Sequence, residues 1–213
     1  GFEGSYTLSR SRDYNSLSSP PTRVTVQNSH DPAESIGPSD FDARHRFVIR
    51  ATWQPPWRGR RLLEGWLLAA VVQGQSGNPV NIVTVNSAVT GTAGTLRPDL
   101  TGRIRIVGDT KEWFDTSAFT AVSRFGNLPR NAVIGPRFDN VDVSIARRSR
   151  IGPATLQFRA DVFNLLNHPN FGQPGGIVGS PDFGRITNTR FPSGDVSSSR
   201  QVQLSLSVEL LDR

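Results

Sequence analysis

One stretch near the end of the sequence decides the fold class: Gln201-Val202-Gln203-Leu204-Ser205-Leu206-Ser207-Val208-Glu209-Leu210. Every second residue in it is apolar, and the residues between them are all polar. Successive side chains of a β-strand point to opposite faces of a sheet, so this alternation predicts a strand with one apolar and one polar face. A helix would instead repeat its apolar residues three or four positions apart.

Further segments show the same alternation, which makes about six strands in total. The segment from Glu64 is apolar on both faces at its start, so its facing stays open. Lengths of about ten residues are typical of strands in membrane-spanning barrels. The further segments cover Phe2–Arg10, Phe41–Trp53, Glu64–Gln75, the residues around Val141–Ile145 and the residues around Leu156–Val162.

The composition favours strands over helices. The 213 residues are 36% hydrophobic and include 20 Gly and 15 Pro. The longest apolar run, Trp66–Val72, is far shorter than the ~20 residues of a membrane helix, so any membrane crossing uses strands. The absence of Met, with Gly1 first, indicates a fragment whose start and signal peptide lie upstream. The absence of Cys excludes disulfides and thiolate chemistry.

The net charge of +6 and the pI of about 11.0 raise nucleic acid as a partner. The cations are scattered from Arg10 to Arg213 among acidic residues, and Lys111 is the only lysine. No basic stripe forms, so we expect no nucleic-acid binding.

The connections between the strands alternate in length. The long ones span about 12–40, 77–138 and 166–199, and the short ones span 54–63 and 149–153. Outer-membrane barrels pair long extracellular loops with short periplasmic turns, whereas a soluble sandwich has no reason to sort its loops. In the longest connection, Trp113–Phe119 is expected to form a local hairpin or helical turn.

These patterns predict an all-β fold, an antiparallel transmembrane β-barrel segment of about six strands in contact with outer-membrane lipid. Six strands cannot close a barrel without exposing edges in lipid, so we expect an incomplete barrel whose other strands lie upstream or come from other chains. Trp53, Trp57 and Trp66 flank a short turn and are predicted to form an interfacial aromatic girdle. The alternative is a core cluster around a hairpin; the Arg-rich turn 58–61 favours the girdle.

Charged residues inside the strands are costly on a lipid face, so we expect them to face the lumen. Their role is either contact with a plug or an anionic solute, or an ion-pair ladder that keeps the interior wet. The lumen-facing candidates are Arg46, Arg50, Gln157, Arg159 and Asp161.

We expect no enzymatic activity, no metal and no cofactor. His30, His45 and His168 fall in loops or at a strand edge, and they lack the spacing of metal ligands. A polar cluster at the end of the fifth strand is explained equally by ligand contact and by turn formation. That cluster consists of Asn164, Asn167, His168 and Asn170.

Several phrases, in order along nearly the whole chain, resemble the C-terminal barrel of TonB-dependent receptors of the Oar-like kind, whose longer chains carry a carboxypeptidase-regulatory-like domain. The phrases are Ser5–Ser11, Asp40–Phe47, Gly65–Trp66 with Gln75–Pro79, Arg97–Asp99, Trp113–Phe119, Phe125–Asn127, Arg130–Asn131, Asn140–Ser144, Phe158–Asn164, Asn167–Gly172 and Phe183–Ile186.

The resemblance implies a receptor in the outer membrane of a Gram-negative-type bacterium that takes up an unidentified extracellular ligand, powered through TonB. Residues 1–213 would be the C-terminal part of its barrel, and the plug and N-terminal domains would lie upstream. Barrels of this kind usually end on an aromatic residue that the barrel assembly machinery reads. This chain ends Glu209-Leu210-Leu211-Asp212-Arg213, and Leu210 is interpreted as the substitute because it is in phase with the lipid face.

Two alternatives to the receptor remain at this point. A passive porin-like barrel would have no plug sequence upstream. A soluble β-sandwich binding module would be a water-soluble monomer.

Overall fold

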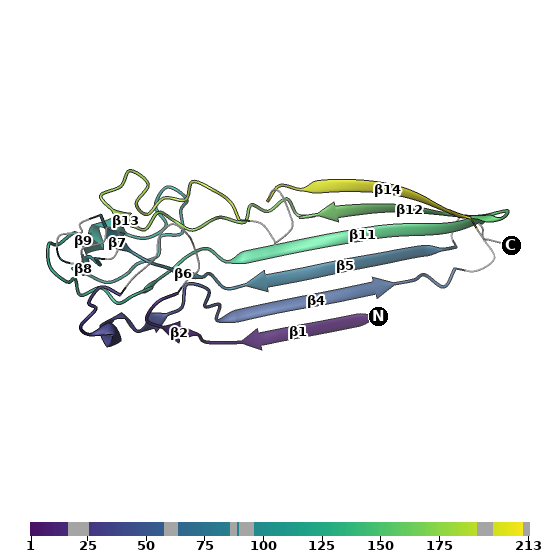
Figure 1. Cartoon of the computed structure of the whole chain (residues 1–213). Coiled ribbons are helices and arrows are strands. Elements are labelled where there is room, and N and C mark those ends of the chain that lie inside the picture. The colour runs from purple at the N-terminus through teal and green to yellow at the C-terminus, as the bar shows by residue number, and fades with distance from the viewer. Residues whose placement is uncertain (17–25, 58–63, 86–88, 90–95, 191–197, 211–213) are drawn as a thin grey trace.

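The computed structural model describes residues 1–16, 26–57, 64–85, 89, 96–190 and 198–210. All the predicted strands are present, and they lie side by side in one antiparallel sheet (Figure 1). Among the described residues the only helices are two short 3₁₀ turns, and none is long and apolar enough to cross a membrane. The strands of the sheet are β1 (Phe2–Leu8), β4 (His45–Trp53), β5 (Trp66–Gln75), β11 (Phe138–Ile151), β12 (Ala154–Phe163) and β14 (Gln201–Leu210).

The sheet follows the chain, because each long strand pairs with the long strand before it, in the order β1-β4-β5-β11-β12-β14. β1 and β14 form the two edges. Within the described part of the chain they do not pair with each other, so the sheet is open.

The strands at the first connection are shorter than predicted. β1 ends at Leu8 and β4 begins at His45, not at Phe41. The Asp42 side chain accepts a hydrogen bond from the backbone N–H of Ser11 at 2.6 Å, which holds these residues in a turn outside the ladder.

The register places like with like over most of the sheet, with Arg147 and Asp139 as charged exceptions on the apolar face. One row runs Phe2, Ala51, Ala70, Val143, Val162 and Val202 through all six strands, and every member is apolar. The row Thr52, Ala69, Ser144, Asp161 and Gln203 lies on the opposite face and is mainly polar. The sheet therefore has one apolar face and one polar face, as the alternation predicted.

The facing of β5, which the sequence left open, is decided by its neighbours. Leu68 pairs with Trp53 and Ile145, so it lies on the apolar face. Leu67 pairs with Ala146 and lies on the polar face. The polar face is therefore interrupted by apolar side chains along β5.

All long connections lie at one end of the sheet and the short ones at the other (Figure 1). This confirms the predicted sorting, with one correction. β11 and β12 pair as far as Ile151 and Ala154, so the turn is only Gly152-Pro153 and not 149–153. Gly152 has a φ of 59°, a conformation that side chains disfavour, which explains why the ladder can close so tightly there.

The three long connections fold together into one body, which we call the cap (residues 9–16, 26–44, 76–85, 96–137 and 164–190). It is built on two 3₁₀ turns, η1 (Pro32–Ser35) and η2 (Thr116–Ala118), and on four short strand pairs. Its buried core consists of Val80, Ile82, Phe114, Ala118, Phe119, Leu128 and Val133. The pairs are β2 (Arg12–Asp13) with β3 (Gly37–Pro38), β6 (Pro79–Val80) with β10 (Val133–Ile134), β7 (Val83–Thr84) with β13 (Ile177–Val178), and β8 (Asp99–Leu100) with β9 (Phe119–Thr120).

Candidate functional site: two sheet faces and a cap

The apolar face has the height of a membrane core. From Trp66 to Gly74 it covers nine residues of β5, ~27 Å along the strand at 3.4 Å per residue, and a tilted membrane-spanning strand has about 9–11 residues. The apolar band of an outer-membrane barrel is about 25 Å tall. On β14 this face leaves Leu204 66% and Leu206 68% exposed. Side chains this apolar and this exposed are suited to contact with lipid.

The three predicted girdle tryptophans gather at the short-turn end of this face. Trp53 and Trp66 end β4 and begin β5, both on the apolar face. Trp57 packs edge-on against Trp53 with a centroid distance of 5.9 Å, and the Arg147 guanidinium lies 5.5 Å from the Trp66 ring centre. Trp53 and Trp57 are 55% and 45% exposed, which does not fit the alternative of a core cluster. The girdle itself stays a prediction.

A second aromatic group lies at the cap end of the apolar face and was missed by the sequence reading. Tyr6 stacks on His45 at 6.2 Å, and their Oη and Nδ1 atoms are 2.8 Å apart. Tyr6 also pairs across the ladder with Phe47. The alternation of the first two strands could have revealed this group, because pairing these strands antiparallel brings Tyr6 next to His45 and Phe47.

The five predicted lumen residues all lie on the polar face. Arg159 donates to Asp161 at 2.8 and 2.9 Å, and Arg50 lies 4.0 Å from Glu3. The Arg148 side chain, which sequence reasoning did not single out, donates to Gln157 at 2.8 Å. Arg46 lies between Thr7 and Gln75. This face thus carries one ion pair between strands, Arg50–Glu3, and one within β12, Arg159–Asp161. The ion-pair ladder stays a prediction.

Arg130 fastens the first long connection to the second. Its side chain is 1% exposed and binds Asp13 at 2.5 Å and Asp40 at 3.0 Å. It also donates to Ser16 at 2.8 Å, while the neighbouring Asn131 donates to Asp40 at 2.6 Å. A buried guanidinium is retained only with such partners, so this cluster fixes the relative position of the two connections.

Arg97 makes a second fastening between the same connections. Its Nε donates to the Leu128 carbonyl at 2.8 Å, and its terminal amino groups reach Ser35 at 3.1 Å and the Glu34 carbonyl at 3.3 Å. Its backbone N–H donates to the Gln27 side chain at 2.8 Å. Burial lowers the pKa of Arg97 from its usual value, although the side chain stays charged.

The third connection joins the cap through aromatic contacts. Phe114, Phe119 and Phe183 pack edge to face with centroid distances of 5.4 to 5.9 Å. The backbone N–H of Trp113 donates to the Gly184 carbonyl at 2.7 Å. The predicted helical turn in Trp113–Phe119 is present as η2, and its aromatic residues are the centre of the cap core.

The asparagines near the end of β12 make local backbone contacts, and His168 takes part in them through its backbone. Asn164 and Asn167 have φ values of 49° and 51°, and the Asn164 side chain donates to the His168 carbonyl at 2.9 Å. These residues do form a turn, and ligand contact by the same side chains stays an untested alternative. In the described ranges no three metal-binding side chains gather at one point.

These features define an outer-membrane barrel protein: a two-faced antiparallel sheet of membrane height with its long connections at one end. The chain belongs to the outer membrane beta barrel domain family, whose model it matches over residues 1–203. No curated protein matches this chain, and neither does any solved structure.

The family places the protein in the outer membrane and removes the soluble β-sandwich from consideration. The single layer of the sheet agrees, because a sandwich needs a second sheet packed on the apolar face. Long loops of outer-membrane barrels are extracellular, so we expect the cap to lie outside the cell and the short turns to face the periplasm.

Proposed function

We propose that this chain is the barrel portion of a TonB-dependent receptor, which takes up an extracellular ligand with energy supplied through TonB. The observation that carries the proposal is the cap. Its core is formed by the second connection, and the third packs on that core through Val178 and Phe183. The first connection is attached to the second by buried Arg97 and Arg130. A passive pore needs an open mouth, whereas a receptor needs an ordered extracellular surface that holds a ligand before transport.

The polar face supports the same proposal. Its paired charges at Arg159–Asp161 and Arg50–Glu3 suit a wetted interior in contact with a folded plug. The Oar-like sequence phrases point to the same kind of receptor, and many of them supply cap residues such as Arg97, Phe114 and Arg130. The plug and the TonB-contacting segment would belong to the same polypeptide, upstream of residue 1.

Conductance separates this proposal from a passive porin without knowledge of the ligand. The full-length protein is inserted into planar lipid bilayers, and the current is recorded across it. A plugged receptor is expected to show no steady open channel, because its lumen is filled. A steady ohmic conductance would contradict the receptor and favour the porin.

A second measurement tests the energy coupling directly. A photocrosslinking amino acid is placed across the periplasm-facing segments of the full-length protein in cells. We expect a covalent adduct with TonB that disappears when TonB is deleted. Absence of any adduct at every position, with the protein correctly inserted, would contradict the coupling.

A further inference from the structure

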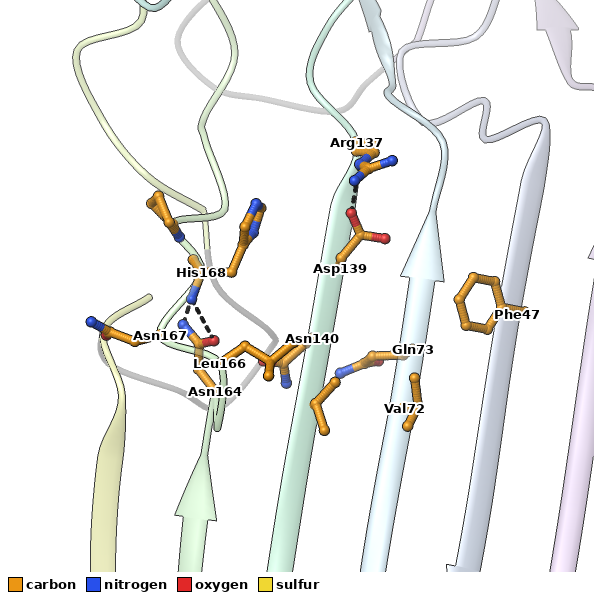
Figure 2. Close-up of a pocket in the computed structure, with 12 residues that line it drawn as sticks. Phe47, Val72, Gln73, Arg137, Asp139, Asn140, Asn164, Leu166, Asn167 and His168 are labelled. Atoms are coloured by element: carbon orange, nitrogen blue, oxygen red, sulfur yellow. Dashed lines mark hydrogen bonds and ion pairs between the residues drawn. The ribbon is translucent and has the colours of Figure 1, made fainter.

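A groove of about 400 Å³ lies where the sheet meets the cap (Figure 2). Val72 and Val141 lie on its floor, paired with each other across β5 and β11. The Phe47 ring bounds it on the β4 side, and Leu166 bounds it on the opposite side, with the Arg137–Asp139 pair above (Figure 2). We call this the rim groove. It is lined by Phe47, Val72, Gln73, Arg137, Asp139, Asn140, Val141, Asn164, Leu166, Asn167, His168 and Pro169.

The rim groove opens on the apolar face of the sheet. By register, Phe47, Val72, Val141 and Asp139 all lie on that face. Gly74 makes the room, because a Cβ atom there would collide with the Phe47 ring. The groove is therefore continuous with the surface that faces lipid in the outer membrane, and the molecules that reach it are membrane lipids.

Part of its lining is apolar, at Phe47, Val72, Val141 and Leu166, and an acyl chain would lie along this part. Leu166 is 68% exposed and Leu165 is 39% exposed, although both belong to a connection at the sheet end. Exposed leucines beside an apolar sheet face extend the lipid-contacting surface upward toward the cap.

Its upper end carries a cation. The Arg137 side chain is 76% exposed, and its Nε binds Asp139 at 2.7 Å. This contact is an ion pair, and among the described residues the Arg137 side chain makes no hydrogen bond. The Asp139 contact orients the guanidinium through Nε and leaves the terminal amino groups able to bind a phosphate in the two-pronged way that guanidinium favours.

We propose that the rim groove binds one lipid with an anionic phosphate headgroup from the surrounding leaflet, with an acyl chain over Val72 and Val141 and the phosphate on Arg137. The arrangement matches a lipid in a membrane. The apolar residues Val72 and Val141 lie within the strands, and the Arg137 cation lies nearer the cap, where the strands end. The proposal rests on the outer-membrane fold and is independent of the receptor function.

The test measures lipid selectivity on the full-length protein in phosphatidylcholine vesicles. The probes are phosphatidic acid and phosphatidylcholine, each spin-labelled on an acyl chain, and electron paramagnetic resonance gives the motionally restricted fraction of each. The wild type is expected to restrict phosphatidic acid several-fold more strongly than phosphatidylcholine.

Three variants locate the effect. Arg137→Gln is expected to bring the ratio of the two lipids close to one, and Val141→Trp to reduce the restricted fraction by filling the groove. Val208→Trp, on the same face of β14 and away from the groove, is expected to behave as wild type. Unchanged selectivity in Arg137→Gln would overturn the proposal, as would an equal loss in Val208→Trp. Arg137 lies outside the sheet, so Arg137→Gln is expected to insert into the membrane normally. It still tests the proposal if Val141→Trp fails to insert.

Free phosphate distinguishes a lipid site from a site for soluble anions. Inorganic phosphate added to the same vesicles is expected to leave the restricted phosphatidic acid fraction unchanged, because it lacks the acyl chain. Complete displacement of the labelled lipid would overturn the lipid assignment.

Discussion

At the scale of single residues, the cap depends on a few buried cations. Arg130 is 1% exposed and holds Asp13 and Asp40, whereas Arg124 binds Asp99 from a side chain that is 67% exposed. Burial makes the difference, because a buried pair that loses one partner leaves a desolvated charge, while an exposed pair returns to water. The two arginines therefore form a matched comparison within one body.

Arg130→Gln is expected to destabilise the attachment of the first long connection by about 3–5 kcal/mol. Hydrogen exchange of the full-length protein should show faster exchange over residues 9–16 and 26–44, with the sheet unchanged. Arg124→Gln serves as the control and should cost less than about 1 kcal/mol. Equal protection in the two variants would show that Arg130 does not hold the cap.

At the scale of the elements, the apolar and polar faces of each strand determine which of its side chains contact lipid and which face the lumen. Leu204 of β14 lies opposite Ala160 on the apolar face, while its neighbour Gln203 lies opposite Asp161 on the polar face. A change of one position along the strand thus moves a side chain from lipid to lumen. The same substitution at these two positions therefore tests which face is which.

Leu204→Arg is expected to destabilise the barrel by about 2–4 kcal/mol, the cost of a cation at the lipid face near the bilayer centre. Gln203→Arg should cost little, because the new cation faces Asp161. Denaturant unfolding of the full-length protein in lipid vesicles measures both. Equal destabilisation by the two variants would contradict the assignment of the faces.

At the scale of the whole molecule, the cap is held by ionised carboxylates. Partial burial of Asp13 opposes its ionisation, but hydrogen bonds from Ser39, Ser16 and Arg130 outweigh it and lower the pKa of Asp13. The Arg124 side chain and the Asn127 backbone likewise lower the pKa of Asp99. A lowered pKa in the folded state means that the stabilisation is complete above the ordinary carboxyl pKa of about 3.9 and is lost as the pH falls through the lowered value.

The cap is therefore expected to be closed at neutral pH and to loosen below about pH 4. Spin labels at Ala33 and Ala121, in the first and second connections, report the change through their distance distribution in the full-length protein. Asp13→Asn should broaden that distribution already at pH 7 and respond less to acid. A wild-type distribution that is identical at pH 7 and pH 3 would contradict the role of these carboxylates.

The sequence by itself determined the strands, their two faces and the sorting of their connections. Alternation such as that of Gln201–Leu210 is a local property, since neighbouring residues in an extended chain must point to opposite sides. The sequence could not determine which residues of β5 lie on the apolar face, because Leu67 and Leu68 are both apolar. Only their partners Ala146 and Ile145 distinguish them.

The cap and the rim groove were decided by the tertiary structure alone. Arg130 meets Asp13 across 117 positions, and Phe47 meets Val72 and Val141 only once three strands are in register. Such contacts leave no periodic trace in the sequence, because each depends on how separate segments pack and not on the conformation of any one of them. The membrane sheet could thus be predicted from local pattern, whereas the surfaces proposed to bind ligand and lipid required the fold.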